Sequence, residues 1–172
     1  MKGLLTAGGH GTRLRPITHT KNKHLIPIAN RPMLTYAIGY MADAGIKEIG
    51  IIVNAGDGEI EKSFDSGKEL GVKLTYIPQG RPLGLAHVVK IAEPFIGDDK
   101  FLFYLGDNIL VGGVMKFVDE FEASGSNCHL VLSKVSDPER FGVPEISGDR
   151  IISVEEKPSN PKSDFAVTGI YL

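Results

Sequence analysis

The hydrophobic positions of the chain fall into two alternating patterns. Short, continuous apolar runs, typical of buried strands, are separated by segments in which apolar residues recur every three or four positions, as on one face of a helix. The clearest helical segment is 33–44, which Pro32 precedes and Gly45 ends. The same patterns predict strands at 2–7, 48–54, 73–78, 100–106 and 128–134, and further helices at 58–66, 85–93 and 114–123.

Strands that alternate with helices indicate βαβ units. We therefore predict an α/β fold with a doubly wound, mainly parallel, Rossmann-like sheet. After Pro138 the pattern changes to two extended segments, 142–146 and 150–155, joined by a Ser-Gly-Asp turn, which predicts an inserted β-hairpin. The last apolar run, 165–172, is predicted to be a core strand.

Composition and charge narrow the function classes. A chain of 172 residues, 42% hydrophobic and 23% charged, can build one packed core, so we expect a single domain over 1–172. Nineteen basic and 21 acidic residues give a net charge of −2, which predicts neither a nucleic acid nor an anionic membrane as partner. No apolar run approaches the roughly 20 residues that span a bilayer.

The single cysteine, Cys128, is expected to be a buried strand residue and fits a reducing, cytoplasmic environment.

A glycine-rich segment, 8–13, follows the first predicted strand. Glycines let backbone N–H groups approach an anion closely, so phosphate is the expected ligand. A dinucleotide-binding loop would need glycine or alanine where Leu14 stands and an acidic residue near Asn54. A Walker loop would need glycine in place of Arg13, followed by lysine rather than Leu14. Both patterns are therefore absent.

The segment 7–14 (Ala-Gly-Gly-His-Gly-Thr-Arg-Leu) resembles the glycine loop of the sugar-1-phosphate nucleotidyltransferases, in particular the glucose-1-phosphate thymidylyltransferase branch. The resemblance covers essentially the whole chain. His10 stands where a serine is common in the family, and Thr6 where alanine or serine is common. Matching motifs follow in family order at Pro16, 23–27, 31–33, 84–86, 106–108, 141–143, 155–158 and 168–171.

The resemblance implies transfer of a nucleotidyl group from dTTP or UTP to glucose 1-phosphate, with Mg²⁺ as cofactor. By resemblance, Arg13 and Lys23 face the pyrophosphate leaving group, and Asp107 binds the metal. The implied nucleotide-binding residues are Ala7, Gly8, Gly9, Gly11, Thr12, Gln79 and Gly84. The implied sugar-phosphate residues are Gly142, Glu156, Lys157, Val167 and Gly169.

The chemistry of such a reaction agrees with these residue types. A phosphate monoester, whose second pKa is about 6, is already largely dianionic at neutral pH, so cations and alignment matter more than a general base. Asp107 ends an apolar strand, where ligands of open α/β sheets gather, and a carboxylate suits Mg²⁺. An amide at Gln79 can pair with O4 and N3–H of thymine or uracil, whereas the donor and acceptor pattern of cytosine is reversed.

Several alternatives stay open. The substrate could be another sugar 1-phosphate, such as that of mannose or N-acetylglucosamine, although Gln79 argues against a guanine site. A non-catalytic nucleotide-binding module is a second alternative, and a nicotinamide oxidoreductase, disfavoured by Leu14 and Asn54, is a third. Family members commonly form homo-oligomers, so a homo-oligomer is also an expectation.

The resemblance further implies that the chain is the N-terminal part of a longer catalytic domain. The second magnesium-binding aspartate of the family lies beyond the last matched motif. We therefore expect nucleotide binding without efficient turnover, and an uncovered sheet edge beside 165–172.

Overall fold

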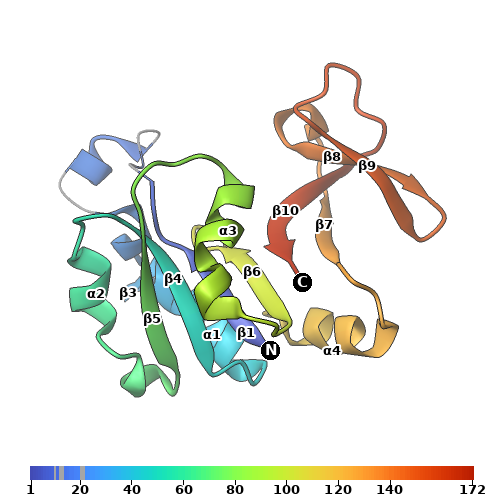
Figure 1. Cartoon of the computed structure of the whole chain (residues 1–172). Helices are drawn as coiled ribbons and strands as arrows, with labels where there is room; N and C mark the ends of the chain where they lie inside the picture. Colours follow the sequence, from blue (N-terminus) through green and yellow to red (C-terminus); the bar gives the residue numbers. More distant parts are fainter. Residues whose placement is uncertain (10, 12–13, 20–21) are drawn as a thin grey trace.

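A six-stranded mixed sheet forms the centre of the computed structural model, which describes residues 1–9, 11, 14–19 and 22–172. The strand order is β5-β4-β1-β6-β10-β7 (Figure 1). These strands are β1 (Lys2–Thr6), β4 (Glu48–Asn54), β5 (Lys73–Gln79), β6 (Phe101–Leu105), β7 (Leu130–Lys134) and β10 (Phe165–Tyr171). A separate antiparallel pair is formed by β2 (Pro27–Ile28) and β3 (Arg31–Pro32).

The direction of the strands changes at β10. Strands β5, β4, β1 and β6 are parallel neighbours, and β10 runs antiparallel to both β6 and β7. The predicted mainly parallel α/β sheet is thereby confirmed. The carboxyl ends of the four parallel strands all lie at one edge of the sheet.

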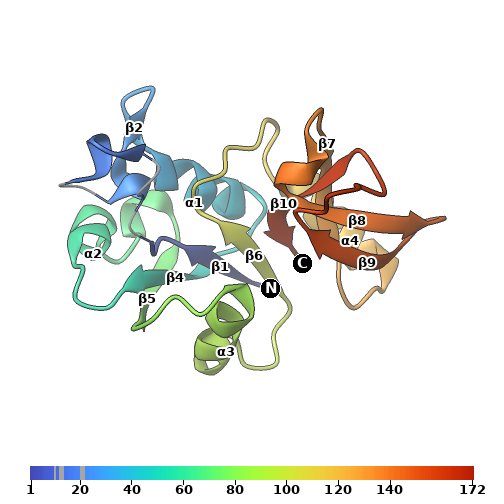
Figure 2. The same ribbon diagram turned by 90° about the horizontal axis from the view of Figure 1, so that it is seen from above.

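Helices cover both faces of the sheet, as the doubly wound prediction requires. The helices are α1 (Met33–Asp43), α2 (Glu59–Phe64), α3 (Leu85–Ile96) and α4 (Met115–Ser124). Buried residues of α1, α2 and α4 belong to one core cluster, and those of α3 belong to a second. Figure 2 shows α3 on the opposite side of β1 and β4 from α1 and α2.

Alternation along the strands explains the two clusters. Leu5 and Ile51 belong to the core cluster that contains the buried residues of α1. Leu4, Ile52 and Phe103 belong to the other cluster, with the buried residues of α3. Successive strand side chains point to opposite faces, so continuous apolar runs are needed where both faces are buried. This is why the parallel strands read as unbroken hydrophobic segments in the sequence.

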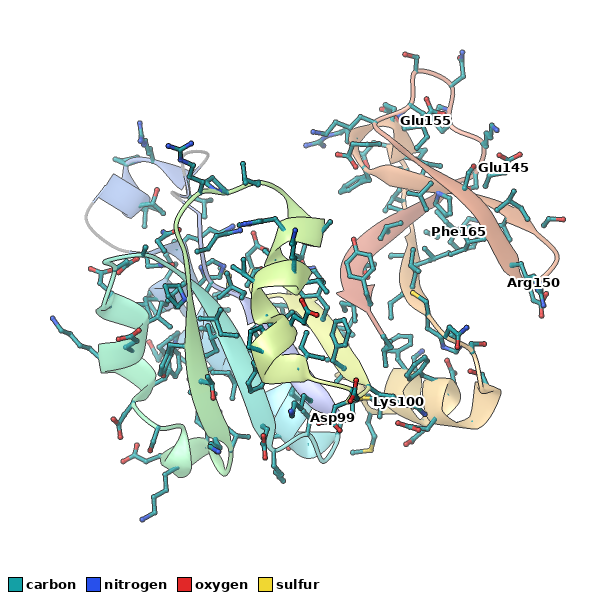
Figure 3. The ribbon with its side chains drawn as sticks, viewed as in Figure 1. Asp99, Lys100, Glu145, Arg150, Glu155 and Phe165 are labelled. Atoms are coloured by element: carbon teal, nitrogen blue, oxygen red, sulfur yellow. The ribbon has the colours of Figure 1, made fainter. Side chains whose placement is uncertain are left out.

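Short 3₁₀ turns and a hairpin complete the regular secondary structure of the described residues. The turns are Ile17–His19, Lys23–Leu25, Lys68–Leu70 and Pro138–Arg140. The hairpin consists of β8 (Gly142–Ser147) and β9 (Arg150–Glu156), and it packs on β10 through β8. Figure 3 shows Glu145, Arg150 and Glu155 on this hairpin, which confirms the predicted insertion.

Some expectations need correction. Cys128 is exposed, and β7 begins at Leu130, because the chain enters the sheet only after Cys128. The expected uncovered edge beside 165–172 was wrong: β10 lies inside the sheet, since β7 bonds to its far side. The helix predicted at 85–93 continues to Ile96 despite Pro94 within it.

Among the described residues, no helix combines the length and the apolar character needed to cross a membrane.

Candidate active site

The predicted nucleotide-binding residues gather where the parallel strands end. The glycine loop follows β1, Asn54 ends β4, Gln79 ends β5, and Asp107 follows β6 by two positions. Ligands of open α/β sheets bind outside the carboxyl ends of the strands. The fold therefore places these groups at the expected edge of the sheet.

Asn54 holds the glycine loop against the neighbouring strand. Its Oδ1 accepts a hydrogen bond from the backbone N–H of Gly9 at 3.0 Å, and Gly9 has a φ of +103°. A Cβ at Gly8 would stand 3.2 Å from the same oxygen, so a side chain there would crowd Asn54. The buried residue Ala7 continues the sheet through a 2.8 Å bond from its N–H to the Ile52 carbonyl. In this structure the Gly9 amide is thus satisfied by the protein itself.

Gly11 brings the far end of the loop close to Lys23. It has a φ of +56°, and its carbonyl accepts from Thr18 Oγ1 at 2.7 Å and from Leu14 N–H at 2.9 Å. A Cβ at Gly11 would lie 3.2 Å from Lys23 Cβ. The predicted roles of Thr12 and Arg13, and the position of His10, lie outside the described residues.

Lys23 and Asp107 form an ion pair across the centre of the site. Lys23 Nζ lies 2.5 Å from Asp107 Oδ2, with side-chain exposures of 20% and 39%. Burial raises the Asp107 pKa, but the hydrogen bond and charge of Lys23 outweigh it, and the net pKa lies below the ordinary value. Asp107 is therefore ionised at neutral pH. The family resemblance assigned Lys23 to the pyrophosphate and Asp107 to the metal. In the structure these two oppositely charged groups contact each other.

Two buried polar side chains on either side of Lys23 fix its backbone. Asn22 Nδ2 donates to the Ala7 carbonyl at 3.2 Å, and Asn22 Oδ1 accepts from His24 N–H at 3.0 Å. The Asn22 N–H donates in turn to Glu59 Oε2 at 2.8 Å. His24 is 1% exposed, and burial, reinforced by the Lys23 charge, lowers its pKa from 6.5 to about 4. This network joins the end of β1 to α2 and leaves Lys23 little freedom at its base.

The end of β5 presents the predicted base-reading amide. Gln79 is half-buried and pairs with Asn54 in the register of β4 and β5. Its Nε2 donates to Nδ1 of His87 on α3 at 3.1 Å. Its Oε1 lies 3.7 Å from the position of a Cβ at Gly8, so the amide adjoins the glycine loop. Gly84, with a φ of +93°, immediately precedes α3, the helix that carries His87.

A cavity of about 890 Å³ brings together all the predicted sugar-phosphate residues. Asp107 also lines it, so the ion pair with Lys23 sits at its border. The predicted residues in its wall are Gly142, Glu156, Lys157, Val167 and Gly169. They come from β8, β9, β10 and the segment that follows β9.

Within this cavity a glycine opens space for a carboxylate. Gly142 faces Glu156 in the hairpin register, and a Cβ at Gly142 would stand 3.4 Å from Glu156 Oε2. Lys157 has a φ of +50°, and its N–H donates to the Phe141 carbonyl at 2.8 Å. That bond continues the pairing of β8 and β9 by one residue, to Lys157 at the cavity wall.

An irregularity in β10 shapes the opposite wall. The pairing of β10 with β7 shifts register between Val167 and Tyr171, and Gly169 within it has a φ of +81°. Asn108 Nδ2 donates to the Thr168 carbonyl, which ties this irregularity to the residue after Asp107. Bulges commonly re-aim side chains at the edge of a site.

The carboxylate of Asp107 fits an Mg²⁺ ion whose other ligands are mainly phosphate oxygens and water. Among the residues that the structure describes, no group of three or more His, Cys, Asp and Glu side chains could hold a metal. Mg²⁺ often takes one or two carboxylates from the protein and completes its shell with phosphate oxygens and water. Asp107, ionised and partly exposed, is suited to that limited role.

Sequence reasoning missed several residues that the structure adds to the site. Asn22, His24 and His87 support the predicted groups, and Arg140 and Tyr171 line the cavity. The available signal was proximity in sequence, since Asn22 and His24 flank Lys23. No local pattern could have paired His87 with Gln79.

The whole of this site lies within one matching family model. The model described as nucleotidyl transferase matches residues 2–172. The chain belongs to this family. Membership agrees with the loop, the ion pair and the cavity described above.

The chain is similar to named relatives within the nucleotidyl transferase family. The glucose-1-phosphate thymidylyltransferase of Streptomyces griseus is 49% identical over 173 residues, covering 100% of this chain and 49% of that protein. A Haloferax volcanii protein named as a low-salt glycan biosynthesis nucleotidyltransferase is 45% identical, with coverages of 100% and 49%. The chain thus spans about half the length of these curated relatives.

Solved structures share the fold. A structure from Bacillus anthracis, described as a glucose-1-phosphate thymidylyltransferase in complex with sucrose, gives a TM-score of 0.94 at 42% identity. The match covers 99% of this chain and 70% of that chain. A UDP-glucose pyrophosphorylase from Acinetobacter baumannii gives a TM-score of 0.82 at 22% identity, covering 99% and 73%.

Proposed function

We propose that the chain carries the site of a nucleotidyltransferase that joins dTTP or UTP to glucose 1-phosphate and releases pyrophosphate. The observation that carries this proposal is the position of the Lys23–Asp107 pair. Lys23 adjoins the glycine loop through Gly11, and Asp107 lines the cavity that holds the predicted sugar-phosphate residues. The pair therefore stands where two phosphorylated substrates would meet.

In this reaction a phosphate oxygen of glucose 1-phosphate forms a bond to the α-phosphorus of the nucleotide. The bond from that phosphorus to the bridging oxygen breaks, and pyrophosphate leaves with the electron pair. Such transfers depend mainly on alignment and on the neutralisation of charge. The groups required of the protein are therefore fixed cations and rigid walls, and no residue has to remove a proton from the nucleophile.

Lys23 supplies a fixed positive charge beside the leaving group. Its backbone is held by the Asn22 and His24 network, and its ammonium is held by Asp107 before substrate binds. A group positioned in advance needs little reorganisation when negative charge develops in the transition state. Asp107 would hold Mg²⁺, whose charge would offset that of the phosphate oxygens.

The two ends of the site account for the two substrates. Gln79 offers one acceptor and one amino group toward a pyrimidine edge beside the glycine loop. Glu156, opposite the open space at Gly142, offers a carboxylate to sugar hydroxyls. Lys157 and Arg140 supply positive charge on the cavity wall for the sugar phosphate. The names of the similar proteins agree with this substrate pair.

Two measurements test the proposal. Calorimetric titration of the chain with dTTP, UTP, CTP and ATP in the presence of Mg²⁺ tests nucleotide recognition. Coupled pyrophosphate release with glucose 1-phosphate, in a full-length protein that contains this chain, tests transfer. We expect dTTP or UTP to bind at least tenfold more tightly than CTP or ATP, since a mismatched base leaves polar groups of the site unpaired. Equal binding of all four nucleotides would contradict the assignment of a pyrimidine site.

A further inference from the structure

The contact between Gln79 and His87 bears on how the site can reject cytosine. The backbone of Gln79 is fixed in the sheet, and its carbonyl accepts from Ala55 N–H at 3.1 Å. Its side-chain amide, in contrast, ends in a torsion that is broad and nearly two-fold in glutamine. The strand therefore does not determine the orientation of that amide.

An amide free to turn over cannot select between uracil-type and cytosine-type edges. In one orientation its amino group donates to O4 and its oxygen accepts from N3–H, as thymine and uracil require. Turned by 180°, its oxygen accepts from the amino group of cytosine and its own amino group donates to N3. Selectivity thus requires a second group that fixes which end of the amide is the nitrogen.

His87 is placed to supply that group. Its Nδ1 lies 3.1 Å from Gln79 Nε2, while Gln79 Oε1 adjoins Gly8 on the other side. An accepting Nδ1 requires the neutral ring with its hydrogen on Nε2. If the amide turned over while the ring kept its hydrogen on Nε2, two acceptors would face each other, and this hydrogen bond would be lost. Restoring the bond would require the ring hydrogen to move to Nδ1.

We propose that His87 is a positioning residue that determines pyrimidine selectivity by fixing the orientation of the Gln79 amide. This inference rests on the proposed function, because it assumes that Gln79 reads the base. His87 itself need not touch the nucleotide. Its effect is expected on the ratio of affinities for two pyrimidines rather than on the affinity for triphosphate as such.

Two substitutions separate this role from a structural one. His87→Leu removes the acceptor, and His87→Asp restores an acceptor that cannot donate when ionised. The added charge of the aspartate weakens both nucleotides alike, so it cancels in their ratio. His129→Leu is the matched control, because His129 contacts Ser124 Oγ at 3.1 Å through Nε2 and lies outside the proposed site.

The experiment is calorimetric titration of each variant of the chain with dTTP and with CTP in the presence of Mg²⁺. We expect His87→Leu to lower the dTTP-to-CTP affinity ratio by about 3- to 10-fold, the effect of one hydrogen bond, while His87→Asp and His129→Leu keep the ratio. Circular dichroism checks folding, and His87→Ala serves as a second acceptor-free variant if the leucine variant does not fold.

The outcomes distinguish this inference from the function on which it rests. An unchanged ratio in the folded acceptor-free variants, or an equal loss in His87→Asp, would overturn the role of His87 and leave the proposed function standing. Failure of the unmodified chain to prefer dTTP over CTP would overturn both.

Discussion

Lys23 Nζ and Asp107 Oδ2 lie 2.5 Å apart although the two residues are 84 positions apart in sequence. Lys23 lies in the segment that follows β1. Asp107 follows β6, which neighbours β1 on the side away from β4. Because β1 and β6 are parallel neighbours, their carboxyl ends bring the two groups to one edge. The central charge pair of the site is thus a product of strand order.

Removal of the Lys23 charge is expected to lower turnover. Lys23→Ala should reduce pyrophosphate release by about 10²-fold or more, because it deletes a charge aimed at the leaving group. Lys100→Ala is the matched control, since Lys100 pairs with Glu122 at 2.6 Å on the surface. Steady-state rates in a full-length protein that contains this chain provide the measurement. Near-normal turnover of the Lys23 variant would contradict its role.

Gln79→Ala is expected to weaken pyrimidine binding without unfolding the chain. The side chain is half-buried at the end of β5, so its removal leaves the core intact. Loss of its contacts to the base should reduce preference for dTTP over CTP by about tenfold. Competition binding measures this ratio, and thermal unfolding provides the control. A ratio equal to that of the unmodified chain would assign Gln79 a structural role only.

Stability should fall when the pH is lowered from 7 to 5. The pKa of His24 is about 4 in the folded chain and 6.5 as the ordinary value, so the unfolded chain binds more protons in this window. Its contribution is therefore present above pH 6.5 and is lost as the pH falls toward 4. The expected loss from this group is about 2 kcal/mol of unfolding free energy.

Urea unfolding of the chain and of His24→Gln at pH 7 and pH 5 measures this contribution. The difference between the two proteins isolates His24 from the other histidines. Asp107, whose pKa is lowered, contributes in a range below its ordinary value of 3.8 and does not affect this window. An identical pH dependence in both proteins would exclude His24 as the source.

Gly169→Ala should destabilise the chain more than Gly148→Ala does. Both glycines have positive φ, +81° and +62°, so each alanine incurs a backbone cost of about 1–2 kcal/mol. Only at Gly169 would the new Cβ also overlap a side chain, that of Leu105, which adds about 1–3 kcal/mol. Chemical denaturation compares the two. Equal losses would show that the irregularity in β10 accommodates a side chain.

Apolar periodicity predicted most elements to within a few residues, because both faces of the sheet are buried and the spacing records that burial. It could not predict that β10 enters between β6 and β7, since pairing order is decided by contacts far apart in sequence. Similarly, Asn22 and His24 lie in a polar segment that reads as solvated, yet distant partners such as Ala7 and Glu59 bury them.

The residues of the candidate site came mainly from the resemblance to a family. The structure brings Gly142 and Glu156 into one cavity with Asp107, which the spacing of the motifs alone did not require. Supporting residues such as His87 carry no motif of their own. The assignments to Thr12 and Arg13 stay predictions, since the structure does not describe those residues.

The place of β10 has a consequence for the order of events during synthesis on the ribosome. Among the described strands, β7 pairs only with β10, so residues 130–134 have no sheet partner until residues 165–171 have been made. The parallel block β5-β4-β1-β6 can form from residues 2–105 as soon as they emerge. The cavity wall beyond Asp107 then forms last, when β10 joins the finished block to the hairpin and β7 in one late step.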